Sequence, residues 1–298
     1  MFAILRQSRA YPLLLLLATG VSLGLALPFV RIATGSGITV PAFAFWQYFG
    51  GGLGLLLIAI LTGAKPPLGA LYLRFYAISG LITLALPSLL IFLAVSRIGA
   101  GLPGIAYAFP AMLTYVFALL LGMERPAWTR AIGIALGLCG ILMILLPRSG
   151  PVDDAALPWM LLAMIAPVSL AMGNIYRTRY WPKDAAPLAL AAGTLLGAAF
   201  WLLVTSLGMG AFYWPAFSAG SADWTLPAAM VFACLSFLTY FELQRVAGPV
   251  YLSQIGYVMA ATGLFIGTTV FGERYGLTVW LAVVVIVAGI LLVNRRSA

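Results

Sequence analysis

Apolar runs of about 20 residues recur along the chain, and this feature limits its possible folds more than any other. Each run is long enough to cross the roughly 30 Å of a bilayer's hydrocarbon core as a helix. Hydrophobic residues make up 63% of the 298 residues and charged residues 8%, whereas a soluble domain carries roughly 25% charged residues. Such a chain cannot cover its surface with polar groups, so we predict an all-α integral membrane protein. Ten transmembrane helices are expected, at Pro12–Arg31, Pro41–Thr62, Leu73–Val95, Gly101–Leu121, Trp128–Leu146, Leu157–Tyr176, Pro187–Gly208, Thr225–Gln244, Pro249–Phe271 and Gly276–Val293.

The first run has a second interpretation. Arg6 and Arg9 precede it, and Gly24-Leu25-Ala26 has the small-x-small pattern of a signal-peptide cleavage site. We favour an uncleaved span, because the run is about 20 residues long and is similar to the runs that follow it.

The positions of Lys and Arg predict the orientation of the spans. With the N-terminus in the cytoplasm, twelve of these residues, including Arg177 and Lys183, fall on the cytoplasmic side and four on the outer side. Because cytoplasmic loops are enriched in positive residues, both termini are predicted to be cytoplasmic, in the plasma (inner) membrane of a prokaryote. The basic residues stand singly between apolar blocks, which argues against a nucleic-acid partner despite the net charge of +9.

The two halves of the chain resemble each other. A shift of 149 residues, half of 298, aligns a helix, an acidic-basic corner and a second helix in the same order. We therefore predict two repeats, residues 1–149 (spans 1–5) and 150–298 (spans 6–10), in one transport unit. An odd number of spans inverts the second repeat, which is typical of transporters that alternate access around a midplane site. The aligned pairs are Gly99 with Gly248, Glu124 with Glu273, Arg125 with Arg274, and Gly140 with Gly289.

Together these features resemble the EamA type of the drug/metabolite transporter superfamily. The resemblance covers essentially the whole chain and rests on the five-plus-five inverted spans, the Glu at the fourth-to-fifth corner of each half and the Gly in each fifth span. The length and the stretches YWPKD and YFELQRVAGPVY are most similar to YddG-type bacterial amino-acid exporters. The resemblance implies export of aromatic and other neutral amino acids from the cytoplasm.

Neutral polar side chains at membrane depth are the candidates for a substrate site. Tyr107, Pro110 and Thr114 share one helical face, so they can line one cavity. Hydroxyls, amides and carbonyls suit a small zwitterion, and tyrosine rings suit its side chain. The alternative is hydrogen bonding between helices, worth roughly 0.6 kcal/mol for each bond. The full set is Ser22, Tyr107, Pro110, Thr114, Ser169, Asn174, Ser236, Tyr240, Gln254 and Tyr257.

Glycines and prolines mark predicted hinges and helix contacts. Two links between spans are expected to flex as the two faces of the membrane are exposed in turn, the alternative being tight turns. Pairs such as Gly133/Gly137 and Gly193/Gly197 predict close helix packing. Gly133, Gly137 and Gly140 also offer a dimer face, so a monomer and a homodimer both stay open. The hinge candidates are Gly99, Gly101, Pro103, Gly248 and Pro249.

Missing residues exclude several chemistries. The chain has no His, which removes serine-histidine and cysteine-histidine catalysis, and no Asp lies mid-span. Cys139 and Cys234 lie in apolar runs and indicate neither a disulfide nor a metal site. We therefore expect no cofactor and no enzymatic activity. Glu242, the one acid within a span, is expected to pair with Arg245.

The resulting functional prediction is a secondary exporter of small neutral metabolites, with aromatic and other neutral amino acids as expected substrates. The lack of Lys and Arg at mid-depth argues against sugar phosphates and nucleotide sugars. One alternative is an exporter of drugs or other amphipathic solutes. A channel or lipid scramblase is less favoured, because a channel would more often show a repeated polar stripe or charged rings. A membrane enzyme is disfavoured by the missing catalytic groups.

Overall fold

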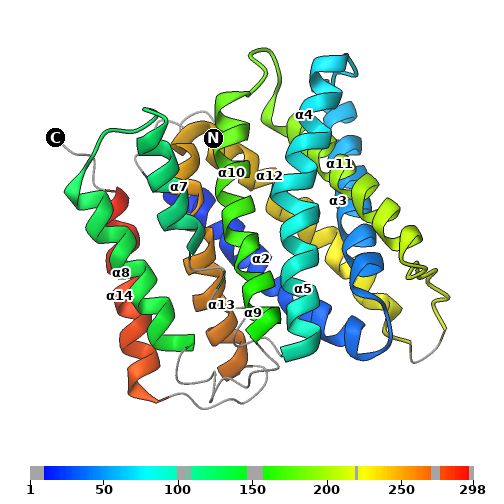
Figure 1. The fold of residues 1–298 in the computed structure, drawn as a ribbon. Coiled ribbons are helices and arrows are strands. Elements are labelled where there is room, and N and C mark those ends of the chain that lie inside the picture. Colours follow the sequence, from blue (N-terminus) through cyan, green and yellow to red (C-terminus); the bar gives the residue numbers. More distant parts are fainter. Residues whose placement is uncertain are drawn as a thin grey trace. The chain divides into compact units, whose positions relative to one another are not determined.

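A computed structural model describes residues 10–98, 106, 109–145, 157–218, 221–269 and 276–294. Every regular element in these ranges is helical (Figure 1). A π-helix, η1 (Leu81–Ala85), and a 3-10 helix, η4 (Ala222–Trp224), accompany the α-helices. The α-helices are α2 (Tyr11–Gly35), α3 (Val40–Leu61), α4 (Ala70–Gly80), α5 (Leu86–Ile98), α7 (Phe109–Leu120), α8 (Trp128–Leu145), α9 (Leu157–Ala163), α10 (Ile165–Arg179), α11 (Pro187–Gly208), α12 (Thr225–Leu252), α13 (Ile255–Thr269) and α14 (Leu277–Asn294).

Each of the ten predicted spans overlaps a helix in the described part of the chain. Two shorter helices, Phe109–Leu120 and Leu277–Val293, are also apolar. The prediction of an all-α membrane protein is confirmed at this level, whereas the count of ten spans and their inversion stay predictions. Within the described ranges, five stretches are long and apolar enough to cross a membrane: Tyr11–Gly35, Val40–Leu61, Ala70–Ala94, Pro187–Gly208 and Ala222–Leu252.

Proline marks where three of the long helices begin. Pro12, Pro41 and Pro187 each stand in the first turn. The N–H groups of a first turn have no acceptor within the helix, so proline, which lacks an N–H, costs no hydrogen bond there. Beyond the ends of α3 and α11, Gly63 and Gly210 adopt φ values of 74° and 60°, the left-handed conformation that often terminates a helix. The starts of these three predicted spans therefore agree with the structure to within one residue.

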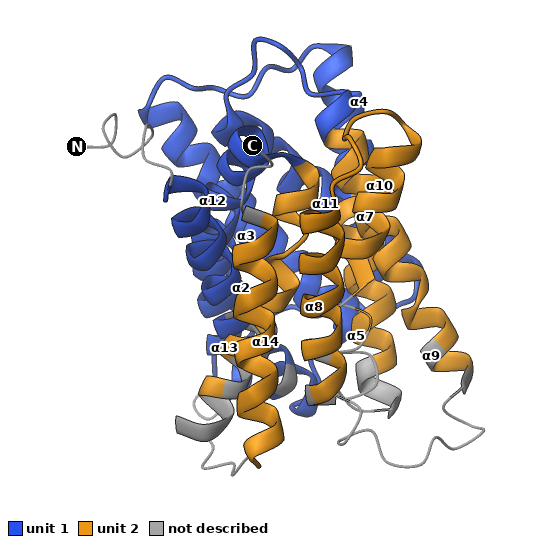
Figure 2. Cartoon of the chain, turned by 90° about the vertical axis from the view of Figure 1, so that its left-hand side faces the viewer, with its two compact units in different colours: residues 1–80, 178–248 blue, residues 81–177, 249–298 orange. Residues whose placement is uncertain are grey.

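The chain divides into two compact units (Figure 2). Unit 1 contains Met1–Gly80 and Thr178–Gly248, and unit 2 contains Leu81–Arg177 and Pro249–Ala298. Each unit therefore takes segments from both predicted repeats. A compact unit and a sequence repeat are different divisions of a chain, so the two-repeat organisation stays a prediction.

In unit 1, α11 packs against α4 through glycines. A Cβ on Gly80 would lie 2.5 Å from the backbone nitrogen of Ala198, and one on Gly197 would lie 2.4 Å from the carbonyl oxygen of Tyr76. Gly193 lies under the Tyr76 ring, where a Cβ would come within 2.4 Å of Cε1. The two backbones touch, as the Gly193/Gly197 pair predicts.

In unit 2, α8 and α14 make a contact of the same kind (Figure 1). A Cβ on Gly133 would lie 2.7 Å from the carbonyl oxygen of Gly289, and one on Gly140 would lie 2.9 Å from a carbonyl oxygen of α14. Gly137 lies under the ring of Tyr257. These three glycines of α8 therefore serve contacts within the chain, which corrects the suggestion that they form a dimer face.

Two places in the helices depart from α geometry. The helix that begins as α4 widens into η1 before it continues as α5. In α12, Gly248 has φ 78° and ψ 178°, a conformation that is essentially open only to glycine, and Pro249 follows it. The predicted hinge at Gly248 and Pro249 is thus a kink at which one helical segment ends and the next begins.

Candidate functional site

A second interruption follows the kink at Gly248 within a few residues. α12 ends at Leu252, α13 begins at Ile255, and Ser253 and Gln254 form a turn between them. Backbone hydrogen bonds of 3.0 and 3.2 Å hold this turn. Interrupted helices are tolerated at membrane depth only where protein or a cavity satisfies the freed backbone groups, and such breaks form the substrate sites of many transporters.

Gln254 places a buried amide in this turn. Its side chain is 0% exposed, and neither Oε1 nor Nε2 has a hydrogen-bond partner among the described residues. An amide left in this state costs about 1–3 kcal/mol, and buried polar atoms in proteins are almost always bonded. A partnerless amide at a helix break is therefore suited to receive a polar ligand.

Three further polar side chains meet in unit 2. Nδ2 of Asn174 donates to Oγ1 of Thr114 at 3.4 Å, and Nη2 of Arg177 donates to Oδ1 of Asn174 at 2.8 Å. All three residues are buried. Because the guanidinium has only donors, its bond keeps the amide oxygen of Asn174 on its own side and turns the amide nitrogen toward Thr114. The 3.4 Å bond is long for an N–H···O contact, so it is weak.

Other predicted substrate residues of unit 2 bond to the backbone. Ser169 Oγ donates to the carbonyl of Ile82 at 2.6 Å, and the Tyr257 hydroxyl donates to the carbonyl of Ile134 at 3.2 Å. Pro110 is buried in α7. These contacts favour the packing alternative for Ser169 and Tyr257, whose role toward a substrate stays a prediction.

The remaining candidates are distributed over the chain. In unit 1, Ser236 Oγ donates to the carbonyl of Phe232 at 2.6 Å, and the Tyr240 ring lies 5.2 Å from that of Phe237. Ser22 is half-buried in α2. The structure thus brings Thr114 and Asn174 together, gives Ser169, Ser236, Tyr240 and Tyr257 separate contacts, and leaves the Gln254 amide without a partner among the described residues. Tyr107, Gly99, Gly101 and Pro103 lie outside the described residues.

Comparison with known protein families shows a similarity over the first half of the chain. The model of the EamA-like transporter family matches residues 10–146. Over this stretch, slightly less than half of the chain, the protein is similar to that family. The match supports the predicted drug/metabolite transporter superfamily, and with it a membrane transporter that handles a small molecule in a lipid bilayer.

Similarity of fold to a solved structure extends over nearly the whole chain. A solved crystal structure of a protein covers 96% of this chain and 98% of its own, with a TM-score of 0.76 and 17% sequence identity. At this identity the similarity shows the fold alone. No curated protein matches the chain.

The burial of Arg177 was not predicted. The sequence predicts only that this residue lies on the cytoplasmic side, and its side chain is 0% exposed. Its spacing of three residues from Asn174 on one helix was the available signal, because such residues are neighbours on a helix surface. The predicted pairing of Glu242 with Arg245 is confirmed at 2.7 Å. In the described ranges, no group of three or more His, Cys, Asp or Glu side chains is placed to hold a metal ion.

Proposed function

We propose that this protein exports small neutral metabolites, with aromatic and other neutral amino acids as its substrates, across the inner membrane of a prokaryote. The EamA-like match supports the transporter class. The observation that carries the substrate class is the fully buried amide of Gln254, which has no partner within the described residues.

The polar groups of unit 2 suit a zwitterion without net charge. The Gln254 amide has two N–H donors and one oxygen acceptor, so it can bond a carboxylate or an ammonium group. Thr114 contributes a hydroxyl, and Asn174 contributes an amide oriented by Arg177. A neutral amide costs far less to bury in the empty site than an uncompensated charge would, which favours this lining for a carrier that releases its substrate in every cycle.

Alternating access is the proposed mechanism, with the break at Gly248 and Pro249 as one hinge. The chain passes from unit 1 to unit 2 between these two residues. No heavy atom lies within 4 Å of a Cβ built on Gly248, so neighbouring atoms do not obstruct a change of the backbone there. Gly99, Gly101 and Pro103 form the second hinge in this proposal, and both termini are cytoplasmic.

Substitution of Gln254 by Met tests the substrate site. Met keeps a similar length and removes every hydrogen-bonding atom of the amide. If Gln254 binds substrate, the apparent KM for neutral amino acids should rise about tenfold, equivalent to roughly 1.4 kcal/mol of lost hydrogen bonding. The thermal midpoint of the ligand-free protein should stay equal or rise, because an unsatisfied amide has been removed. Both are measured on purified protein, by counterflow in liposomes and by thermal unfolding in detergent.

Gln47 provides the matched control. It is another buried glutamine, on α3 in unit 1, and its Oε1 also lacks a partner within the described residues. Gln47→Met should leave the apparent KM unchanged. An unchanged KM in Gln254→Met together with a raised midpoint would show that the amide is idle. Loss of uptake for amphipathic drugs but not for amino acids would point to the drug-export alternative.

A further inference from the structure

The loop that joins α11 to α12 in unit 1 carries three exposed aromatic side chains. Trp214, Phe217 and Trp224 are 74%, 62% and 52% exposed. We call residues 211–218 the aromatic strap; Trp224 follows it, at the end of η4. Large rings exposed in this way indicate a surface that contacts something other than water.

Asp223 fixes the strap from within. The residue is 0% exposed. Its Oδ1 accepts a hydrogen bond from the Tyr213 hydroxyl at 2.6 Å, and its Oδ2 accepts from the backbone N–H groups of Ala216 and Phe217 at 3.0 and 2.7 Å. Phe217 has φ 49°, a conformation that a non-glycine residue keeps only where its surroundings hold it. The carboxylate therefore holds Phe217 in a strained conformation with its side chain exposed.

α3 holds the strap at a second place. Thr39 Oγ1 donates to the carbonyl of Ala211, and Trp46 Nε1 donates to the carbonyl of Tyr213 at 2.9 Å. The ring of Trp214 packs edge-on against that of Trp46, with 5.7 Å between the centroids. The exposed rings are thus presented from a backbone that is fixed at several points.

The strap presents no charge at its surface. In the sequence between Asp184 and Glu242, Asp223 is the only charged residue, and it is buried and hydrogen-bonded. A charge brought toward the hydrocarbon of a bilayer costs free energy unless it is paired or bonded, and the one charge of this segment is already satisfied. An interface with a soluble protein has a polar rim, so the chemistry of the strap favours lipid as its partner.

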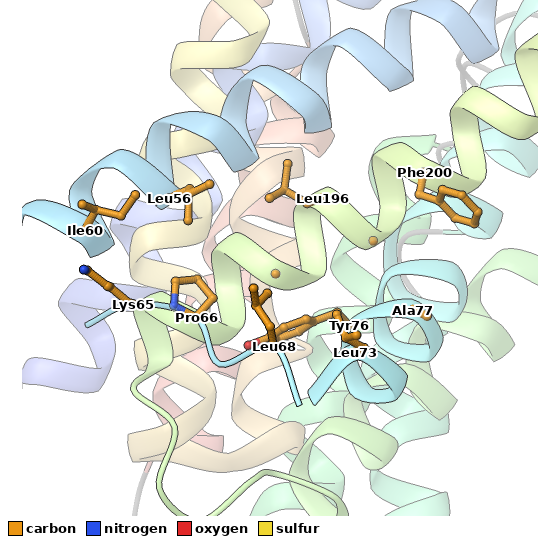
Figure 3. Close-up of a pocket in the computed structure, with 12 residues that line it drawn as sticks. Leu56, Ile60, Lys65, Pro66, Leu68, Leu73, Tyr76, Ala77, Leu196 and Phe200 are labelled. Atoms are coloured by element: carbon orange, nitrogen blue, oxygen red, sulfur yellow. The ribbon is translucent and has the colours of Figure 1, made fainter. Parts of the chain in front are cut away.

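The strap lies where two membrane-length helices meet the same loop. α11 and the stretch Ala222–Leu252 are both long and apolar enough to cross a membrane, so the loop between them lies near the level at which the hydrocarbon ends. Phe200, Val204 and Leu207 are exposed on one face of α11, and Phe200 also borders an apolar groove of about 580 Å³ between α3, α4 and α11 (Figure 3). The exposed face of α11 is that of a helix in contact with lipid, and it leads to the strap.

α12 shows the same pattern on its own exposed face. Val231, Leu235 and Leu238 are exposed and follow one another at spacings of four and three residues, which places them on one face of the helix. Trp224 lies seven residues before Val231, or about two helical turns. Trp224 therefore stands in line with a second lipid-facing surface.

We propose that the aromatic strap and Trp224 anchor unit 1 in the interfacial layer of the bilayer, on the predicted outer side. The rings of Trp214, Phe217 and Trp224 lie between the lipid headgroups and the upper parts of the acyl chains. Tryptophan favours this layer because its ring is apolar and its indole N–H can donate to an ester carbonyl or to water. The anchor is separate from Gln254 and does not depend on the proposed substrate.

Fluorescence quenching in liposomes tests the anchor. The chain has eight tryptophans, so the emission of Trp214 is taken as the difference between the unmodified full-length protein and Trp214→Phe. The liposomes contain phosphatidylcholine brominated either close to the headgroup or near the ends of the acyl chains. The shallow bromines should quench Trp214 about twofold more than the deep bromines, because interfacial rings lie at headgroup level. Trp224→Phe should reveal the same order for Trp224.

Trp201→Phe is the matched control for depth. Trp201 lies seven residues before Gly208, where α11 ends, or about 10 Å deeper along the helix, and its emission should be quenched more by the deep bromines. Equal or greater quenching of Trp214 by the deep bromines would overturn the proposal. Stronger quenching of Trp214 by aqueous iodide than by either lipid would overturn it by placing the strap in water. Protection of Trp214 from iodide and from both lipids would overturn it in favour of a contact with a second copy of the chain.

Discussion

Tyr76 in unit 1 and Tyr257 in unit 2 pack in the same way but differ in the hydrogen bonding of their hydroxyls. Each ring lies on a helical glycine, where an added Cβ would come within 2.4 Å of the ring over Gly193 and within 2.2 Å over Gly137. The Tyr257 hydroxyl donates to the carbonyl of Ile134 at 3.2 Å, whereas the Tyr76 hydroxyl has no partner in the part of the chain described. The contact in unit 2 satisfies the hydroxyl within the protein, whereas the contact in unit 1 leaves a buried hydroxyl unsatisfied among the described residues.

This difference shows that residue type alone does not identify a membrane-depth tyrosine as a binding residue. Tyr257 has the ring and the hydroxyl that suit an amino-acid substrate, yet both are engaged by α8. Tyr76 has the same groups in a segment that sequence analysis did not select. The two tyrosines differ in whether the hydroxyl has a hydrogen-bond partner, and this depends on tertiary contacts.

The largest effect is expected from placing a methyl group under each ring. Gly137→Ala should lower stability by about 3 kcal/mol, since overpacking costs roughly 1–3 kcal/mol and the displaced Tyr257 also loses its hydrogen bond. The loss of stability for Gly193→Ala should be smaller than that for Gly137→Ala by about 1–2 kcal/mol, because Tyr76 has no such hydrogen bond to lose. Thermal unfolding in detergent measures both.

Gly208→Ala controls for the change of residue, because Gly208 is helical and no heavy atom lies within 4 Å of its added Cβ. It should be neutral or slightly stabilising, given the higher helix propensity of Ala. Equal losses for Gly137→Ala and Gly193→Ala would contradict the distinction between the two contacts.

A smaller effect is expected from removing each hydroxyl. Tyr257→Phe should lower stability by about 1 kcal/mol, the usual net value of a protein hydrogen bond. Tyr76→Phe should leave the protein unchanged or slightly more stable, because it removes a buried unsatisfied group. A loss in Tyr76→Phe as large as that in Tyr257→Phe, measured in the same detergent, would show that the Tyr76 hydroxyl is already bonded.

The smallest effect on stability is expected at a third tyrosine, Tyr213. It lies in the loop after α11, where its hydroxyl donates to Asp223 at 2.6 Å. This hydrogen bond to the carboxylate raises the pKa of Tyr213 above its ordinary value, with smaller contributions from burial and from the charge of Asp223. The bond's stabilising contribution is therefore complete below about pH 10 and is lost as the pH rises through the raised pKa.

Thermal midpoints measured between pH 8 and pH 11 should therefore fall slightly more for the unmodified protein than for Tyr213→Phe. Parallel curves would mean that the bond contributes nothing to stability.

Much of the fold was predictable because its signals are local. Hydrophobic runs predict the helices, prolines in the first turn mark several of their starts, and the Glu242–Arg245 pair needs only helical spacing. The glycine pairs predict close contact. Which helix each glycine faces depends on residues far away in the chain. For this reason the sequence left a dimer face open for Gly137 beside packing within the bundle, although Tyr257 covers this glycine.

The candidate site was less predictable, because it depends on which polar groups find partners. Thr114, Asn174 and Gln254 were selected as neutral polar residues at membrane depth. Periodicity cannot show that Asn174 bonds Thr114 while Gln254 has no partner within the described residues. The count of charges predicts on which side of the membrane Arg177 lies and says nothing of its burial. Its long side chain is buried beside Asn174.

The π-helix η1 also determines how the chain tolerates changes in length. A π-turn accommodates one residue more than an α-turn, and the five residues Leu81–Ala85 hold that surplus in the middle of one helix. Because the wider turn holds the surplus, removing one of these residues would restore the α repeat and leave each residue of α5 on the side of the helix that it now occupies. Removing a residue from a regular α-turn would instead rotate the residues that follow by about 100° about the helix axis, and α5 would present a different set of side chains to α9. The segment Leu81–Ala85 is therefore where this helix can lose one residue without a change in the buried surface of α5.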